Sequence, residues 1–319
     1  MNWANWLLIV VIIVALIVLT PNVEDGAPNV EDGWIVISPM WGLCNRLRTL
    51  RVAHDLAKAL NRRLAVVDVA QDEEFKSMFN GRLRDLFVSR WLTFLDVVPQ
   101  HQATRFTHNE DCTLRTTLKE MQSVRSKYIV IRACGLTVDG GLTETNEFYQ
   151  SLVPTALSTA RMAQALSQIT PNTIGVHIRQ GNISDYRKGN FFGAWKQHQD
   201  PTKLPIECCD NGDNSDKVCP NNAPRIEQFI EKMKAENAVN GTSTFFVCSD
   251  RPGCYNVLRQ TFPGQIINNP VEIEYDAKAL NAFCDWYCLA KCNQIIVTSI
   301  SSFSGEAAKM NGAKVITLT

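Results

Sequence analysis

The segment GVHIRQGN, residues 175–182, ends a strand-like apolar run with a histidine and an arginine. Side chains alternate along a strand, so His177 and Arg179 are expected to point to the same side. Open α/β sheets bind ligands at the carboxyl ends of their strands. An imidazole beside a guanidinium at such a place suits an anion that also carries hydrogen-bonding groups, such as a nucleotide diphosphate. A structural arginine paired with a neighbouring carboxylate would give the same pattern, and both interpretations stay open here.

A second polar cluster follows the apolar run 34–39, in the segment SPMWGLCNRLRTL. A glycine-containing turn leads there into a helix, whose first turn offers free backbone N–H groups and the positive end of the helix dipole. Gly42, Asn45 and Arg46 lie at this turn and could bind a sugar or a phosphate. The segment is neither G-x-G-x-x-G nor a Walker A loop, which argues against nicotinamide and P-loop nucleotide binding. The alternative is an ordinary turn with a solvated Arg46.

Two more strand ends in the last third of the chain carry polar side chains. Asp250 ends the run FFVCSD, where a carboxylate can accept the paired N–H donors of a guanine ring. Ser301, Ser302 and Ser304 follow the run QIIVTS at an expected helix start, where hydroxyls and backbone amides can bind phosphate. Serine capping of the helix is the alternative. The segment SFSGE lacks the first glycine of G-x-S-x-G, so a hydrolase nucleophile at Ser304 is not supported.

The elements that position these residues alternate between strand and helix. The expected strands are 34–39, 64–69, 127–134, 173–178, 244–250, 264–269, 294–299 and 314–318. The expected helices are 46–62, 155–169, 224–238, 253–262, 276–292 and 301–312. This alternation predicts an α/β fold of parallel sheets covered by helices on both faces. The pattern restarts near residue 171, which predicts two Rossmann-like domains, 34–170 and 171–319, with a cleft between them.

The amino-terminal segment predicts a membrane anchor. Residues 1–20, MNWANWLLIVVIIVALIVLT, carry no charged side chain and would span about 30 Å as a helix. The absence of Lys and Arg ahead of the apolar stretch, and of a small-residue cleavage site, favours an uncleaved anchor over a signal peptide. Residues 21–33 hold a turn-rich near-repeat and predict a flexible linker. The expected location is a single-pass type II membrane protein, with a Golgi- or ER-like lumenal catalytic domain in a eukaryotic host.

Charge and cysteine content narrow the function classes. Lys and Arg number 32, as do Asp and Glu, so no overall basic bias points to nucleic acid as a partner. The 11 cysteines are compatible with an oxidising compartment. The segment 208–219, CCDNGDNSDKVC, together with His198, lacks zinc-site spacing, so a disulfide-tied loop is favoured over a metal site. Cys284, Cys288 and Cys292 share one face of an expected helix and are predicted to be small buried side chains.

Three of these motifs resemble those of the GDP-fucose-dependent fucosyltransferases, the superfamily of α1,2-, α1,6- and protein O-fucosyltransferases. GVHIRQGN resembles the H-x-R-x-G-[DN] motif of the superfamily and is most similar to the α1,6 branch that includes the bacterial nodulation enzyme. WGLCNRL is similar to the G-x-x-N-[QR] turn, and DWYCLAKCNQIIVTSISSFSGEAA to the pattern of Asp, apolar helix, Cys, apolar strand and S-S-F-S. The motifs occur in the family order and cover the chain from about Trp34 to its end.

The resemblance implies a GT-B-like fold and a glycosyltransferase. The donor substrate would be GDP-fucose, bound mainly by the second domain, and the acceptor a glycan hydroxyl. Transfer would invert the configuration at the fucose carbon and would need neither a cofactor nor an obligatory metal. Acceptor choice is expected to lie in the first-domain loops and in residues 180–224, which show no clear periodicity.

The resemblance also implies roles for individual residues. Arg179 matches the arginine that contacts the GDP phosphates, where a guanidinium can bind two oxygens while negative charge grows on the β-phosphate. His177 matches a donor-site histidine near the nucleotide, Asp250 the carboxylate near guanine, and Asn45 the asparagine near the reaction centre. Substrate-binding roles are implied for the remaining motif residues Gly42, Arg46, Gly181, Asn182, Ser301, Ser302, Phe303 and Ser304.

The motif region departs from the family pattern at two positions. Asn182 stands where many members have Asp, and Gln180 where a second Arg or His is common, so the donor site has one cation fewer. An inverting displacement also needs a base for the proton of the acceptor hydroxyl. Asp185, in the loop after Arg179, is the catalytic-base candidate, and an ordinary loop carboxylate is the alternative. Two other functions stay open: transfer from another GDP-sugar, such as GDP-mannose or GDP-rhamnose, and a non-catalytic glycan-binding relative.

Overall fold

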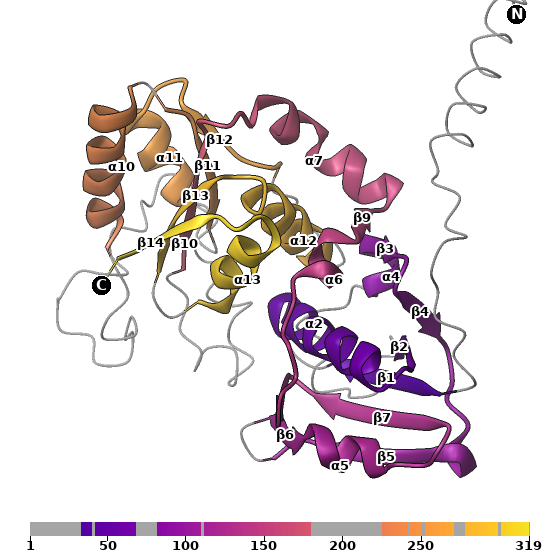
Figure 1. Ribbon diagram of the computed structural model, residues 1–319. Helices are drawn as coiled ribbons and strands as arrows, with labels where there is room; N and C mark the ends of the chain where they lie inside the picture. Colours follow the sequence, from indigo (N-terminus) through magenta and orange to yellow (C-terminus); the bar gives the residue numbers. More distant parts are fainter. Residues whose placement is uncertain are drawn as a thin grey trace, which may run out of the picture.

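Two five-stranded sheets, with helices packed around and between them, make up the described part of the protein (Figure 1). The computed structural model describes residues 33–39, 42–67, 82–109, 112–179, 225–241, 243–249, 253–270, 278–298 and 301–318. In both sheets every pair of neighbouring strands is parallel. The predicted α/β fold with parallel sheets is therefore confirmed.

The first sheet has the strand order β4-β2-β1-β7-β5. Its strands are β1 (Trp34–Pro39), β2 (Arg63–Val67), β4 (Leu92–Leu95), β5 (Ala103–Thr107) and β7 (Tyr128–Ala133). In the central strand β1 the consecutive residues Ile35, Val36 and Ile37 are fully buried. Burial of neighbouring residues shows that both faces of the strand are covered, as is usual in parallel sheets.

The second sheet has the strand order β12-β11-β10-β13-β14. Its strands are β10 (Ile174–Ile178), β11 (Phe245–Ser249), β12 (Ile266–Ile267), β13 (Gln294–Thr298) and β14 (Lys314–Leu318). All five residues of the central strand β10 are buried. A Cβ atom added at Gly175 would lie 2.6 Å from Cδ1 of Leu289, so the glycine allows a helix to pack closely on this strand.

Helices join the two sheets into one core. The longer helices are α2 (Leu43–Ala59), α7 (Ala156–Gln168), α10 (Ile226–Asn240), α11 (Gly253–Thr261), α12 (Lys278–Leu289) and α13 (Ser302–Asn311). Helices α2, α12 and α13 pack against one another, and Figure 1 shows them between the sheets. One apolar cluster extends from Ile35 in β1 through Leu47 and Trp286 to Ile295 in β13. The carboxyl ends of the central strands therefore have a fixed relation to this helical layer.

Short elements between residues 82 and 154 complete the first half. They are α4 (Leu83–Leu86), β3 (Phe87–Ser89), η1 (Gln100–Gln102), β6 (Thr113–Thr117), α5 (Leu118–Ser123), β8 (Gly135–Asp139), α6 (Glu147–Gln150) and β9 (Leu152–Pro154). Strands β3 and β9 pair antiparallel, and β6 and β8 pair parallel. None of these elements was predicted, nor were β4 and β5, because segments this short carry little hydrophobic periodicity.

The predicted elements outside this region are found within three residues of their expected ends. The largest consequence concerns α2, which begins at Leu43 instead of the predicted Arg46. Asn45 and Arg46 therefore lie inside its first turn, where their backbone N–H groups both bond to the carbonyl oxygen of Gly42. The predicted division into domains at residues 170 and 171 stays a prediction.

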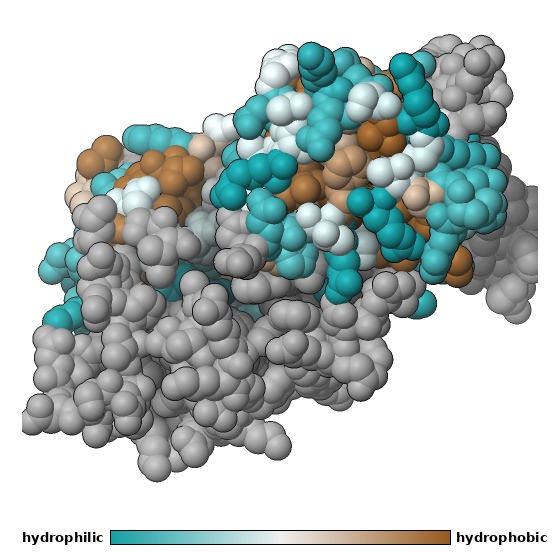
Figure 2. Space-filling model, turned by 90° about the horizontal axis from the view of Figure 1, so that it is seen from below, coloured by the Kyte–Doolittle hydropathy of each residue, from teal (hydrophilic) through white to brown (hydrophobic). Residues whose placement is uncertain are grey.

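No helix among the described residues is long and apolar enough to cross a membrane. The predicted anchor, 1–20, lies outside the described residues, as does the linker 21–33 apart from Gly33, so both stay predictions. On the face shown in Figure 2, apolar residues of the described part form small groups among polar ones. The large apolar side chains that are exposed in the described part are Val88, Val97, Val153, Leu157, Val239 and Val315.

The eight cysteines of the described segments are all buried as free thiols. Cys284, Cys288 and Cys292 on and just after α12 are fully buried, which confirms the prediction made for them. Burial raises the pKa of Cys284 to about 12, so this thiol stays protonated and packs as a small apolar group. Cys208, Cys209 and Cys219 of the predicted disulfide-tied loop lie outside the described residues.

Candidate functional site

The carboxyl end of β10 is the centre of the candidate site. His177 is the fourth residue of this central strand and is 5% exposed, and Arg179 directly follows the strand. The backbone N–H of Arg179 donates a hydrogen bond to Oγ1 of Thr298 at 3.2 Å. Because Thr298 is the last residue of β13, this bond fixes the exit of the chain from β10 against the neighbouring strand.

The side chain of His177 is held by the first turn of α13. Its Nδ1 lies 3.2 Å from the hydroxyl of Ser304, and its ring stacks on Phe303 with 4.8 Å between centroids. Burial, and then the positive charge of Arg179, lowers the pKa of His177 to about 3. The imidazole is therefore neutral near physiological pH and acts as a hydrogen-bonding group, while Arg179 supplies the positive charge.

The amino-terminal end of α13 faces the same region. Ser301 caps the helix, its hydroxyl accepting a hydrogen bond from the backbone N–H of Phe303 at 3.3 Å. The alternative interpretation as a capping serine is thus correct for Ser301. Ser302 is exposed in the first turn, whereas Ser304 is buried against His177. Backbone N–H groups at the start of a ten-residue helix, its dipole and the exposed Ser302 together can bind an anion.

The first turn of α2 lies beside these groups. The Cys44 thiol shows this: burial and the charge of Glu306 raise its pKa, while the charges of Arg179 and Arg48 lower it. Helix α2 also packs directly on α13. The structure therefore brings the Gly42–Asn45–Arg46 turn, the His177–Arg179 strand end and the serine turn of α13 to one place, although they are far apart in the sequence.

Two residues near the site had not been predicted as site residues. Arg48 follows Asn45 by three positions, and its Nη2 lies 3.4 Å from Oδ1 of Asn45, while its buried Nε has no hydrogen-bond partner among the described residues. Asp285 on α12 accepts a hydrogen bond from Nδ2 of Asn269 at 2.9 Å, and burial raises its pKa to about 7. The i,i+3 spacing on one helix face could have indicated Arg48.

Asp285 lies close to the end of β11. Burial, and then the charge of Asp285, raises the pKa of the Cys248 thiol and of the Tyr255 hydroxyl. The Tyr255 hydroxyl accepts a hydrogen bond from the backbone N–H of Ser249 at 3.0 Å. A second carboxyl group thus lies near the strand end that leads to Asp250. Asp285 is the Asp that begins the motif DWYCLAKCNQIIVTSISSFSGEAA, but no role was predicted for it, because the segment has the pattern of an amphipathic helix.

Four predicted site residues lie outside the described residues: Gly181, Asn182, Asp185 and Asp250. Their assigned roles stay predictions, as do the roles of the described site residues. In the described ranges no group of three or more His, Cys, Asp and Glu side chains is arranged to hold a metal ion.

Comparison with known proteins gives a match in structure only. No protein-family model and no curated protein sequence matches the chain. Among solved structures, a mutant of FUT1 from Arabidopsis thaliana in complex with GDP has a TM-score of 0.54 at 13% identity, covering 90% of this chain and 70% of that one. NodZ α-1,6-fucosyltransferase soaked with GDP-fucose has a TM-score of 0.53 at 14% identity, covering 88% and 93%.

POFUT1 in complex with GDP-fucose is similar to the same degree, with a TM-score of 0.54 at 14% identity, covering 90% of this chain and 98% of that one. NodZ from Bradyrhizobium is among the further matches, at 16% identity and a TM-score of 0.52. At identities this low, the structural matches establish the fold and nothing further. They confirm the resemblance drawn from the three motifs: the chain has the α/β fold of the GDP-fucose-dependent fucosyltransferases.

Proposed function

We propose that this protein is a glycosyltransferase that transfers fucose from GDP-fucose to a glycan hydroxyl with inversion. The observation that supports this most is the meeting of three distant motifs at the carboxyl end of β10, next to the start of α13 and the start of α2. The matched structures with the same fold include complexes with GDP and with GDP-fucose. We therefore propose GDP and GDP-fucose as ligands of this chain too.

The groups around β10 suit a leaving diphosphate. As the bond between the fucose carbon and the phosphate oxygen breaks, negative charge grows on the β-phosphate. A guanidinium at Arg179 can bind two of its oxygens, and the N–H groups of the first turn of α13 can bind others. His177, neutral because its pKa is about 3, donates or accepts a hydrogen bond without adding charge. These groups stabilise the product GDP more than the donor sugar, which favours bond cleavage.

The acceptor reacts from the side of α2. Its hydroxyl oxygen forms the new bond to the fucose carbon as the bond to phosphate breaks, and its proton passes to a base. Asp185 is the proposed base, with Asn45 and Arg46 orienting the fucose and the acceptor. Replacing Asp185 with Asn should abolish transfer while leaving GDP affinity within a factor of about two. Unchanged turnover in this variant would remove Asp185 from the mechanism.

Recognition of guanine is proposed for the end of β11. Asp250 is the predicted carboxylate, and Asp285 is a second candidate because it lies near the same strand end.

The proposed reaction needs no metal, so chelation with EDTA should leave the rate unchanged. The proposed membrane anchor 1–20 places the catalytic part on the non-cytosolic side, which protection of the intact chain from protease in sealed vesicles would test.

The experiment that tests the function uses the full chain and three donors, GDP-fucose, GDP-mannose and GDP-rhamnose, and measures binding and GDP release. We expect GDP-fucose to bind and to give GDP in excess of the enzyme concentration, with Arg179→Ala losing at least 100-fold in rate. Release from one of the other donors instead would keep the reaction class and change the sugar. Binding of glycans without GDP release from any donor would favour the non-catalytic alternative.

A further inference from the structure

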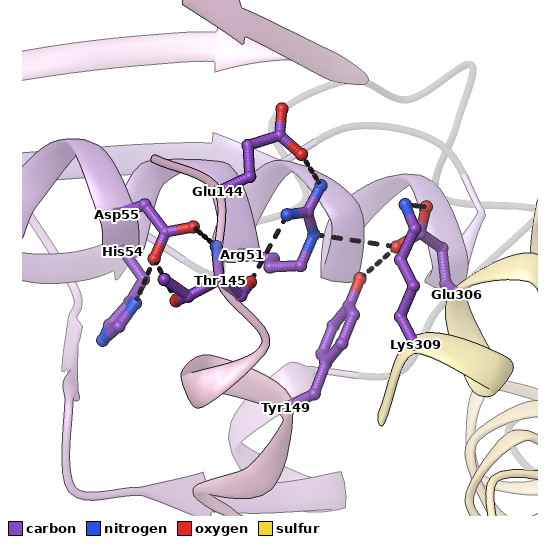
Figure 3. Close-up of polar contacts among 8 residues, drawn as sticks. All are labelled: Arg51, His54, Asp55, Glu144, Thr145, Tyr149, Glu306 and Lys309. Carbon is purple, nitrogen blue, oxygen red and sulfur yellow. Dashed lines mark hydrogen bonds and ion pairs between the residues drawn. The ribbon is translucent and has the colours of Figure 1, made fainter. Parts of the chain in front are cut away.

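A network of charged side chains, in which Arg51 and Glu306 are buried and Glu144 and Lys309 are exposed, connects α2, the segment 144–149 and α13 (Figure 3). Arg51 of α2 donates from Nη2 to Oε2 of Glu144 at 2.8 Å, and its Nε lies 3.9 Å from Oε2 of Glu306. Tyr149 donates its hydroxyl to the same Glu306 oxygen at 2.6 Å. Lys309 donates to the other Glu306 oxygen at 2.9 Å. The network thus centres on the Glu306 carboxylate.

The surroundings of Glu306 fix its position. The residue is 4% exposed, as is Arg51, and Tyr149 is fully buried. A buried carboxylate is tolerated only when it is hydrogen-bonded and its charge is paired, so α13 is held where Tyr149 and Lys309 donate to Glu306 and the guanidinium of Arg51 lies 3.9 Å away. Nearby, Asp55 accepts hydrogen bonds from the backbone and hydroxyl of Thr145 at 2.7 and 2.6 Å, which attaches the segment before Tyr149 to α2 as well.

The turn of α13 that carries Glu306 also faces the candidate site, with the opposite side of the helix. Ser304 and Glu306 are two positions apart, so their side chains leave α13 in nearly opposite directions. Ser304 contacts His177 at the end of β10, whereas Glu306 contacts Arg51 of α2. Helix α13 is therefore fixed between the strand that carries Arg179 and the helix that carries Asn45.

We propose that Glu306 is a positioning residue that sets the register between the donor side of the site, on β10 and α13, and the α2 turn of Asn45 and Arg46. This inference rests on the proposed function. It separates two consequences: GDP needs β10, β11 and α13 but not α2, whereas the fucosyl group and its transfer also need α2. Removing the charge of Glu306 should therefore leave the affinity for GDP unchanged. It should reduce the affinity for GDP-fucose and the rate of transfer, which depend on both sides of the site.

The test compares Glu306→Gln with a matched control. Glu147→Gln makes the same chemical change in the segment that joins the network, but Glu147 is an exposed residue that pairs with exposed Lys58 at 2.6 Å. For each full-length variant, titration calorimetry gives the dissociation constants of GDP and GDP-fucose, and GDP release with water as acceptor gives kcat and KM. Tyr149→Phe, which removes one donor to the Glu306 carboxylate, is the second test variant if Glu306→Gln does not fold.

We expect Glu306→Gln to bind GDP within threefold of wild type, to lose at least threefold in GDP-fucose affinity relative to GDP, and to lose at least tenfold in kcat. Tyr149→Phe should change the same two quantities by less, and Glu147→Gln should change neither. A folded Glu306→Gln variant with unchanged kcat, or with GDP affinity reduced as much as kcat, would overturn the inference alone. Absence of GDP binding by the wild-type chain would overturn the proposed function and, with it, this inference.

Discussion

The two sides of α13 hold polar groups in different ways. Toward α2, the charges of Arg51 and Lys309 are matched by those of Glu144 and Glu306, at contacts between 2.8 and 3.9 Å. Toward β10, the groups are the Ser304 hydroxyl, a neutral imidazole and the helix amino terminus, next to Arg179. The α2 side contains its own anions, whereas the β10 side is arranged to receive one.

This difference separates structural from functional burial of polar groups. A network whose positive and negative charges balance stabilises one arrangement of the helices and needs no ligand to neutralise it. Neutral hydrogen-bonding groups at a strand end and a helix amino terminus leave positive potential that a phosphate can use. Substitutions on the α2 side should therefore act first on stability, and substitutions on the β10 side first on nucleotide binding.

The largest stability effect is expected for Arg51→Met. The substitution removes the cation on α2 from the buried Glu306 carboxylate and the 2.8 Å partner of Glu144, while Lys309 still pairs with Glu306 at 2.9 Å, so we expect a loss of about 3 kcal/mol, the lower end for breaking a buried pair. Urea unfolding of the full chain without nucleotide measures it. A loss below about 1 kcal/mol would mean that the network does not hold α13 to α2, and the contrast between the two sides would fail.

A smaller loss is expected for Tyr149→Phe. Its hydroxyl donates to the Glu306 carboxylate at 2.6 Å, and a hydrogen bond to a charged group contributes about 1.5–3 kcal/mol. The ring itself stays, so its edge contact with Trp286 at 5.5 Å is kept. The same unfolding experiment measures the change. The double variant with Arg51→Met should lose less than the sum of the two single losses, because both act on one carboxylate. Additive losses would contradict a shared network.

His177 and Asp285 should give opposite pH dependences. The folded pKa of His177 is about 3 against an ordinary 6.5, so between these values the unfolded chain binds more protons and stability rises with pH. The folded pKa of Asp285 is about 7 against an ordinary 3.8, so in that window the folded chain binds more protons and stability falls as pH rises. Each slope is at most about 1.4 kcal/mol per pH unit.

Unfolding from about pH 4 to 7 tests both signs, using the pKa window of each group. Relative to wild type, His177→Asn should remove a contribution that rises with pH, and Asp285→Asn one that falls with pH. If His177→Asn runs parallel to wild type over this range, the imidazole is not held neutral by burial beside Arg179, and the description of the β10 side must change.

The smallest effect is expected for the exposed pair of Lys58 and Glu147, which joins α2 to the segment 144–149. Lys58 and Glu147 are 47% and 45% exposed, and pairs of this kind contribute at most about 1 kcal/mol. Glu147→Gln should shift the unfolding free energy by less than that, and the shift should vanish at high salt. A loss comparable to that of Tyr149→Phe would show that burial does not decide how much a polar contact between α2, the segment 144–149 and α13 contributes to stability.

Sequence reasoning reached the strand ends but not the contacts between them. The long apolar runs of β1, β10 and β13 predicted the parallel sheets, and the motif order predicted the fold that the matched structures share. Apart from β7, which was predicted, the elements between residues 82 and 154 were missed because they are short: β3 has three residues and α6 has four. Such segments are specified by tertiary packing more than by local pattern.

The candidate site shows the same limit. The prediction placed His177, Arg179, Asn45 and the serines at strand-to-helix turns. It could not show that His177 is neutral, because that depends on burial under Phe303 of a distant helix. Nor could it find the contact between Tyr149 and Glu306, which lie 157 positions apart and in no shared motif.

The most direct test of the central claim is nucleotide selectivity of the folded chain. Thermal unfolding of the full chain would be recorded with GDP, UDP, CMP and adenosine 3′,5′-bisphosphate at matched concentrations. A ligand at one hundred times its dissociation constant raises the unfolding free energy by about 2.7 kcal/mol. We predict a shift with GDP alone, lost in Arg179→Ala and kept in Glu147→Gln. Equal shifts with all four nucleotides, or none from a folded sample, would contradict a GDP-sugar site at the end of β10.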